Sequence, residues 1–366
     1  MTVLHELAAL GQSIWYDNIR RGILESGEFQ HLLDQGVLGV TSNPSIFEAA
    51  IARSNDYDSA MAALVESGAS VNEIYETLAI EDIGRAADML RPVYDATDGL
   101  DGYVSLEVSP LLAHDTANTI AEARRLFAAL GRPNIMIKVP ATPEGIPAIA
   151  ALIGEGINVN VTLIFSAKQY EAVTGAYLDG LEKLAAQGGE LSRVASVASF
   201  FVSRLDSKVD PMLEALGNRE LQGKIAVANS KVVYARFKEI FAGPRWEALA
   251  ARGARVQRPL WASTSTKNPA YPDTLYVDTL IGPHTVNSVP PQTLEAILDH
   301  GVAALTVEEG LDEARARLAA LAGLGIDLDA VTEELQVEGV QKFAQSFETL
   351  MASIAEKRAK LLEKSA

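Results

Sequence analysis

The chain has 366 residues, of which 48% are hydrophobic and 22% are charged, proportions typical of a globular enzyme with a sizeable core. It contains no cysteine, which excludes disulfides, thiolate metal sites and a cysteine nucleophile. The formal net charge of −17 disfavours nucleic acid and anionic membranes as partners, although a local group of Arg and Lys can still bind an anionic metabolite.

The N-terminal segment lacks the basic start and apolar run of a signal peptide. No window reaches the roughly 18 uninterrupted apolar residues of a membrane span. We therefore expect a cytoplasmic protein that binds no membrane. The five histidines show no zinc-motif spacing, and a metal-dependent aldolase usually needs clustered ligands, so we expect neither a metal nor another cofactor.

Short apolar runs alternate with longer helical stretches along the chain. The runs predict strands at residues 13–17, 37–41, 102–108, 134–139, 157–164, 194–200, 258–263 and 283–288. The βαβα alternation predicts a parallel sheet. Eight such units favour a closed (β/α)8 TIM barrel over an open sheet.

Several of the helices between the strands carry start and stop signals. Helical patterns cover residues 81–95, 116–130, 167–187 and 292–300. Gly131 ends the second of these, Ser166 can cap the third, and Pro290 and Pro291 open the fourth. From residue 301 the pattern is entirely helical. We expect a single barrel domain over residues 1–366, with roughly 301–366 as a helical segment packed on its outside.

Polar side chains recur on one face of four predicted strands. Parallel strands covered by helices are normally apolar on both faces, so these polar residues need a reason. The residues that lie opposite the apolar faces are Asp17, Ser105, Glu107, Lys138, Asn158, Asn160 and Thr162. If the apolar faces pack on outer helices, the polar set points into the barrel near the C-terminal ends of the strands, where active sites of this fold lie.

Lys138 gives this polar set a chemical meaning. Burial disfavours a charged ammonium, and a neutral amine can attack a ketone to form a Schiff base. The protonated imine permits cleavage of the neighbouring carbon–carbon bond, and nearby carboxylates can move the protons. The structural alternative makes Lys138 an edge or surface lysine with Asp17 and Glu107 as ion-pair partners. The pattern by itself leaves both interpretations open.

Six segments of the chain resemble the transaldolase family. They are GVTSNPSIF at 39–47, SLEVSP at 105–110, IMIKVPATPEGI at 135–146, INVNVTLIFS at 157–166, SVASFFVSRLD at 196–206 and LWASTSTKNP at 260–269. They follow the family's order, and the last two are similar to its longer bacterial form. The resemblance implies an enzyme of the pentose phosphate pathway that moves a dihydroxyacetone unit between sugar phosphates.

The resemblance also implies catalytic roles for four side chains. Lys138 would form the Schiff base, while Glu107 and Thr162 would hold a water for the proton transfers of imine formation. Asp17 would take the C4 hydroxyl proton and start cleavage. Sedoheptulose 7-phosphate and glyceraldehyde 3-phosphate would thus give erythrose 4-phosphate and fructose 6-phosphate, and we expect a monomer or a homodimer.

Substrate-binding residues follow from the same motifs. The family match gives this role to Asn43, Asn160, Ser199, Phe201, Arg204 and Ser263. Arg204 would bind the phosphate, because a guanidinium can donate two parallel hydrogen bonds. Each has a structural alternative, such as a turn residue for Asn43, a satisfied strand hydroxyl for Ser199 and a surface arginine for Arg204.

The sequence departs from the family's pattern after Ser263. Short transaldolases carry a second arginine just after that serine, whereas this chain has Ser-Thr-Ser-Thr-Lys. We expect Lys267 to supply the second positive charge, shifted by two positions. A lysine provides a point charge and not a planar fork, so the phosphate site would differ in geometry.

Three other functions fit parts of the pattern. A Schiff-base aldolase of the same superfamily would release free dihydroxyacetone, and a metal-dependent lyase would need a metal ion. A non-catalytic sugar-phosphate-binding barrel would keep Arg204 and lose the catalytic residues. The presence together of Asp17, Glu107, Lys138 and Thr162 argues against this last function.

Overall fold

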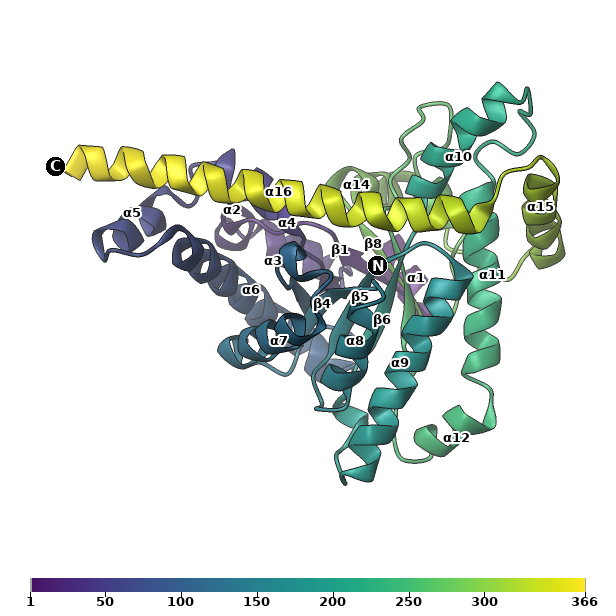
Figure 1. The fold of residues 1–366 in the computed structure, drawn as a ribbon, viewed down its shortest axis with the longest axis horizontal. Helices are drawn as coiled ribbons and strands as arrows, with labels where there is room; N and C mark the ends of the chain where they lie inside the picture. Colours follow the sequence, from purple (N-terminus) through teal and green to yellow (C-terminus); the bar gives the residue numbers. More distant parts are fainter. Residues whose placement is uncertain (1, 366) are drawn as a thin grey trace.

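Eight parallel strands close into a barrel in the order β1 to β8 in the computed structural model, which describes residues 2–365 (Figure 1). The strands are β1 (Gln12–Tyr16), β2 (Gly39–Val40), β3 (Tyr103–Glu107), β4 (Ile135–Pro140), β5 (Val159–Ile164), β6 (Ser196–Phe201), β7 (Arg258–Ala262) and β8 (Thr285–Val289). All eight predicted strands are present, and every boundary lies within two residues of the prediction. The TIM-barrel prediction is therefore confirmed.

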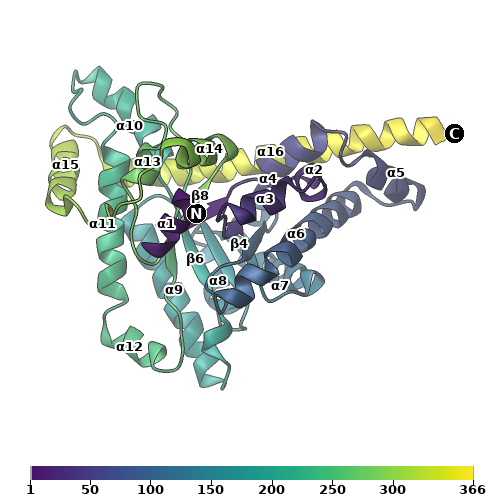
Figure 2. The same ribbon diagram turned by 180° about the vertical axis from the view of Figure 1, so that it is seen from behind.

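Helices surround the barrel and connect its strands (Figures 1 and 2). The first half of the chain contributes α1 (Val3–Ala9), α2 (Arg21–Glu25), α3 (Glu28–Asp34), α4 (Pro44–Phe47), the π-helix η1 (Glu48–Ala52), α5 (Asp58–Glu66), α6 (Val71–Ala96), η2 (Pro110–Leu112), α7 (Thr116–Leu130) and α8 (Gly145–Ile153). The second half contributes α9 (Ala167–Ala186), η3 (Leu191–Arg193), α10 (Ser203–Ala215), α11 (Ile225–Ile240), α12 (Pro244–Ala250), α13 (Leu275–Asp278), α14 (Pro291–His300), α15 (Leu311–Gly323) and α16 (Leu328–Ser365).

Most helix signals predicted the observed ends, and one helix start was missed. Gly131 ends α7 in the left-handed conformation with φ 58°, and the Ser166 side chain caps α9 by accepting from the Gln169 amide. Helix α6 begins ten residues before the predicted start of 81, because Ser70 and Glu73 form a capping box there.

The chain after residue 301 is less uniformly helical than predicted. Residues 301–310 contain turns and no helix, and α15 and α16 follow. Helix α16 does not lie on the outside of the barrel alone: it contacts β5 and the helices α4, α5, α6 and α10. It runs across one end of the barrel in both views (Figures 1 and 2).

The N-terminal end of the barrel interior is closed by a buried polar group. Arg258 Nη2 donates to Asp101 Oδ1 at 2.9 Å, and Ser13 Oγ donates to Asp101 Oδ2 at 2.7 Å. Trp15 Nε1 donates to the same carboxylate, and its ring lies against Gly39, where a Cβ would stand 2.6 Å from the indole. These side chains fill the N-terminal end of the barrel interior. The interior therefore opens toward the C-terminal ends of the strands.

Among the helices of residues 2–365, none combines the length and apolar character that a transmembrane span requires.

Candidate active site

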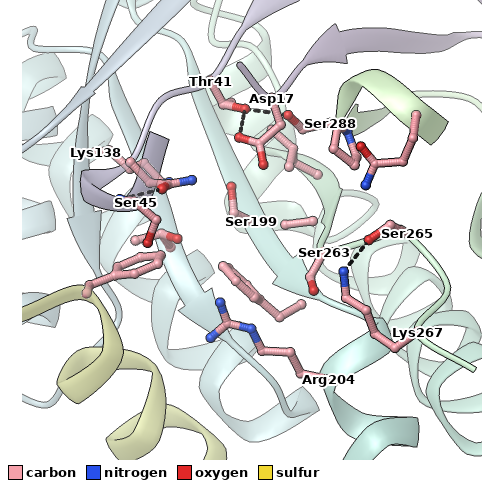
Figure 3. Close-up of a pocket in the computed structure, with 18 residues that line it drawn as sticks. Asp17, Thr41, Ser45, Lys138, Ser199, Arg204, Ser263, Ser265, Lys267 and Ser288 are labelled. Atoms are coloured by element: carbon pink, nitrogen blue, oxygen red, sulfur yellow. Dashed lines mark hydrogen bonds between the residues drawn. The ribbon is translucent and has the colours of Figure 1, made fainter. Parts of the chain in front are cut away.

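A cavity of about 230 Å³ lies at the C-terminal ends of the strands (Figure 3). Nine of the eleven predicted site residues line it: Asp17, Asn43, Lys138, Thr162, Ser199, Phe201, Arg204, Ser263 and Lys267. Glu107 and Asn160 lie next to these residues within the barrel and contact members of the lining. The fold therefore brings together predicted side chains on four strands, β3 to β6, in the segments that follow β1, β2 and β7, and at the start of α10.

Lys138 lies on β4 with its side chain inside the barrel, and it is 5% exposed. Its Nζ donates to the Ser42 carbonyl oxygen at 3.1 Å and stands 3.4 Å from Glu107 Oε2. The strand register pairs Lys138 with Glu107 on β3 and with Asn160 on β5, so the side chains of three neighbouring strands point to the same region. A buried amine with one carboxylate beside it is the arrangement that imine chemistry needs.

Glu107 and Thr162 both have a buried polar atom without a hydrogen-bond partner among residues 2–365. These atoms are Glu107 Oε2 and Thr162 Oγ1. Burial raises the pKa of Glu107, and the positive charge of Lys138 opposes part of that rise. Buried polar groups are almost always hydrogen-bonded in folded proteins, so these two atoms suit a site that is completed by a bound molecule.

Asp17 follows β1 and lines the cavity. Its backbone N–H donates to the Val289 carbonyl at 2.8 Å, which fixes the chain at the barrel rim. Thr41 Oγ1 donates to Asp17 Oδ1 at 2.7 Å. Burial raises the pKa of Asp17, whereas the charge of Lys138 and the Thr41 hydrogen bond act to lower it. A carboxylate with a raised pKa is suited to accept a proton near neutral pH.

The two amide side chains of the predicted site, Asn160 and Asn43, occupy different environments. Asn160 Nδ2 donates to Ser105 Oγ at 3.0 Å, and Asn160 Oδ1 accepts from Ser199 Oγ at 2.7 Å. This amide therefore fixes the position of Ser199, which lines the cavity. Asn43 Oδ1 caps α4 by accepting from the Ser45 and Ile46 amides. Asn43 thus fulfils its structural alternative as a turn residue while also lining the cavity.

Asn158 does not join the polar set at the C-terminal end, and the prediction for it was wrong. Its Nδ2 donates to the carbonyls of Pro133 and Ile135, and its Oδ1 accepts from the Ala195 amide. The residue precedes β5 and joins the starts of three strands at the N-terminal end of the barrel. The alternation identified its face correctly but not its height along the barrel axis.

Two cations share the end of the cavity away from Lys138 (Figure 3). Among the described residues, neither Arg204 nor Lys267 has a carboxylate within ion-pair distance, in a chain with a net charge of −17. Burial lowers the pKa of Arg204, and burial together with the charge of Arg204 lowers the pKa of Lys267. Arg204 Cζ lies 4.8 Å from the centre of the Phe201 ring. Arg204 is half-buried and Lys267 is exposed. Two cations without a protein counter-ion at one end of a cavity are suited to bind an anion.

Serines surround this cationic end. Lys267 Nζ donates to Ser265 Oγ, and the hydroxyls of Ser203 and Ser263 lie 3.0 Å apart. Ser263 has φ 54°, a left-handed backbone that a serine rarely adopts. Strain of this kind is often found at functional sites, where the surrounding structure maintains it.

Several lining residues were not identified from the sequence. They are Thr41, Ser45, Leu260, Ala262, Ser265, Ser288, Pro290, Gln292 and Phe343. Phe343 is the least expected of these, because it comes from α16 and lies 5.6 Å from Lys138 Nζ, measured to the ring centre. No local signal in a helix of 38 residues marks one aromatic residue as part of the site.

The donor set of the cavity does not resemble a metal centre. Among residues 2–365, no group of three or more His, Cys, Asp or Glu side chains could hold a metal ion. Asp17 and Glu107 each have a cation or a hydroxyl beside them, so their charges are compensated without one.

Comparisons with known proteins agree with this geometry. Residues 14–354 match the model of the family described as transaldolase/fructose-6-phosphate aldolase. The chain is 54% identical over 355 residues to a transaldolase of Acidothermus cellulolyticus, covering 96% of this chain and 95% of that protein. It is 50% identical over 361 residues to a transaldolase of Thermobifida fusca, and 49% identical over 374 residues to transaldolase 2 of a Nostoc species, covering at least 97% of each chain.

The barrel, the buried lysine and these relatives define an enzyme that transfers aldehyde or ketone residues. The chain belongs to the transaldolase/fructose-6-phosphate aldolase family.

Proposed function

We propose that this enzyme transfers a dihydroxyacetone unit from a ketose phosphate to an aldose phosphate through a Schiff base on Lys138. The two ends of the cavity differ in their chemistry, and this difference supports the proposal. Lys138 and Asp17 face one end, and the unpaired cations Arg204 and Lys267 face the other. A ketose phosphate has the same division, with a carbonyl near one terminus and a dianion at the other.

The proposed reaction begins when the Lys138 amine adds to the ketone of sedoheptulose 7-phosphate or fructose 6-phosphate. Glu107, 3.4 Å from Nζ, and Thr162 on the neighbouring strand support the proton transfers that expel water as the imine forms. Asp17 then takes the proton of the C4 hydroxyl, and the bond between C3 and C4 breaks. Its electrons move into the protonated imine to give an enamine.

The second half of the proposed reaction returns the enzyme to its starting state. The aldose phosphate made by cleavage leaves, and erythrose 4-phosphate or glyceraldehyde 3-phosphate enters. The enamine carbon attacks its aldehyde, the new hydroxyl receives the proton held by Asp17, and the imine is hydrolysed to release Lys138. Such a reaction has ping-pong kinetics, because one product leaves before the second substrate binds.

Borohydride trapping followed by peptide mapping tests the proposed intermediate. With fructose 6-phosphate as the only substrate, we expect a reduced three-carbon adduct on Lys138. Rates with and without an aldose acceptor then distinguish transfer from release of free dihydroxyacetone. Unchanged activity after exhaustive chelation would exclude the metal-dependent lyase. A well-folded enzyme without any adduct would contradict the Schiff base and favour a non-catalytic sugar-phosphate-binding barrel.

Lys267 is expected to bind the substrate phosphate together with Arg204. Lys267→Met should raise KM for fructose 6-phosphate roughly ten- to hundredfold, the effect of losing one hydrogen bond to a charged group. We expect little change in kcat, because the phosphate is bound equally in the ground state and the transition state. Lys168→Met is the matched control, since it removes the same charge from an exposed side chain. An unchanged KM in Lys267→Met would exclude Lys267 from the phosphate site.

The pH dependence of KM gives a second test of Lys267. Because burial and Arg204 lower its pKa from 10.5, Lys267 loses its proton at a lower pH than an exposed lysine. KM for the sugar phosphate should therefore rise on the alkaline side at a pH below 10.5 in the wild type. Lys267→Arg keeps its charge over this range and should remove the rise. The same alkaline rise in Lys267→Arg would assign it to another group.

A further inference from the structure

Phe343 brings the C-terminal helix into contact with both ends of the cavity. The centre of its ring lies 5.6 Å from Lys138 Nζ and 5.8 Å from Arg204 Cζ. The Phe343 side chain is 5% exposed and lines the cavity beside Lys138 and Arg204. The ring therefore covers the space between the reactive amine and the phosphate-binding arginine.

Helix α16 is anchored to the barrel about two turns before this ring. Gln336 Nε2 donates to the carbonyl oxygens of Ala141 at 2.9 Å and Leu163 at 3.0 Å. Ala141 follows β4 and Leu163 lies on β5, the strands that carry Lys138 and Thr162. Leu163 has φ 60° at an irregularity in the β5–β6 pairing, so its backbone departs from the regular sheet where Gln336 binds it.

The helix approaches the strand ends closely between Gln336 and Phe343. A Cβ on Gly339 would stand 2.8 Å from Leu163 Cδ2, so only glycine fits at this contact without displacement. Residues 336, 339 and 343 recur at helical spacing and share one face of α16. This face is the one that the helix presents to the mouth of the barrel.

The helix is also fixed beyond the ring. Ser346 Oγ and Ser45 Oγ lie 2.8 Å apart, which joins α16 to α4, the short helix after β2. Leu350 and Ile354 are fully buried against the rest of the protein. The segment of α16 that carries Phe343 is thus attached to the barrel on both sides of the ring.

We propose that Phe343 is a specificity-determining residue that protects the enamine from water and so favours transfer over release. The inference rests on the proposed function. Release requires the enamine carbon to take one proton from solvent, which gives the iminium of dihydroxyacetone. One water then adds to the iminium carbon, the bond to Lys138 Nζ breaks, free dihydroxyacetone leaves, and the lysine remains as an ammonium.

An aromatic ring at this position opposes protonation of the enamine, the step that separates release from transfer. It occupies space beside Nζ and has no acidic hydrogen, so no proton donor can stand there. An aldose phosphate can still reach the enamine from the cavity side, because Arg204 and Lys267 attract its phosphate there. Transfer is therefore less affected by the ring than protonation of the enamine by solvent is.

The ratio of dihydroxyacetone release to transfer measures this effect directly. Release is measured with fructose 6-phosphate alone, and transfer with erythrose 4-phosphate added. We expect Phe343→Ala to raise the ratio by about tenfold or more, which corresponds to roughly 1.4 kcal/mol of lost discrimination. Phe343→Leu, which keeps an apolar side chain, should give a smaller rise in the same direction.

Phe347 provides the matched control on the same helix. It packs edge-on against Tyr75 with ring centres 5.4 Å apart and does not line the catalytic cavity. Phe347→Ala removes the same ring one turn further along α16, and we expect its ratio to equal that of the wild type. A change in Phe347→Ala as large as that in Phe343→Ala would overturn the inference, because general loosening of α16 would then explain both.

The experiment separates failure of the inference from failure of the proposed function. If the wild type forms the borohydride adduct but Phe343→Ala lowers both rates with an unchanged ratio, the inference is wrong and the Schiff base stands. If the folded wild type forms no adduct, the proposed function itself fails. Should Phe343→Ala not fold, as judged by thermal unfolding, the ratio measured with Phe343→Leu decides in the same way.

Discussion

Lys138→Met is expected to have no detectable transfer activity and to form no borohydride adduct, while remaining folded. Methionine fills a similar volume and has no amine, so covalent catalysis is removed altogether. The cationic end of the cavity is unchanged, and the variant should still bind fructose 6-phosphate through Arg204 and Lys267. Calorimetric titration measures this binding. Residual transfer in Lys138→Met would contradict the proposed mechanism.

The same substitution has a consequence for stability through Glu107. Lys138 lowers the pKa of this buried carboxyl, so its removal should raise that pKa further. A carboxyl whose pKa is higher in the folded protein than in the unfolded chain stabilises the fold at low pH, and this contribution is lost as pH rises through the folded pKa. Lys138→Met should therefore lose stability relative to the wild type as pH rises above the ordinary glutamate pKa of 4.5, by up to about 3–5 kcal/mol.

Unfolding measurements on a double variant check this explanation. Glu107→Gln added to Lys138→Met replaces the buried carboxyl by a neutral amide of the same shape. The additional pH dependence of the single variant should then disappear. If it persists in the double variant, another titrating group is responsible and Glu107 is not the partner that Lys138 stabilises.

The barrel and five of the eleven predicted site residues were predictable because strands alternate with a period of two, whereas the other six were predicted from the family resemblance. Lys138, Glu107 and Thr162 differ from the apolar residues beside them, and that contrast identified the inward face. Alternation gives no information on depth, however. Asn158 has the same parity as Asn160 and yet serves the opposite end of the barrel.

The contribution of α16 was not predictable from local pattern. Gln336, Gly339 and Phe343 are separated from β4 and β5 by more than 150 residues, and only Gly339 is unusual within a helix. Their meaning comes from the position of the helix across the strand ends, which depends on the length of the loops and helices before it. Lys267 was found only through its offset from the family's arginine, and its position in the cavity required the fold.

Asp17→Asn is expected to lower kcat by about 10²–10⁴-fold, the usual contribution of a positioned general base. The amide can still accept the hydrogen bond of Thr41 through its oxygen, so the geometry at the barrel rim is preserved. In the wild type, activity should fall with decreasing pH at a pH above 3.8, because burial raises the pKa of Asp17. Activity that stays constant down to pH 4 would exclude Asp17 as the base.

Thr41→Val tests the hydrogen bond that supports this base. The Thr41 hydroxyl lowers the pKa of Asp17, so its removal should raise that pKa and move the acid limb of the kcat profile to higher pH. At higher pH the carboxylate is ionised in both proteins, and kcat should recover to near the wild-type value. A uniform loss of kcat at every pH would instead assign Thr41 a role in geometry alone.

The trapped species distinguishes loss of cleavage from loss of imine formation in Asp17→Asn. Lys138, Glu107 and Thr162 are intact in this variant, so the Schiff base with fructose 6-phosphate should still form. Without a base for the C4 hydroxyl, the bond between C3 and C4 remains, and borohydride should reduce the intact six-carbon sugar phosphate onto Lys138. The wild type gives the three-carbon adduct instead. A three-carbon adduct at full yield in Asp17→Asn would mean that another group takes the C4 proton.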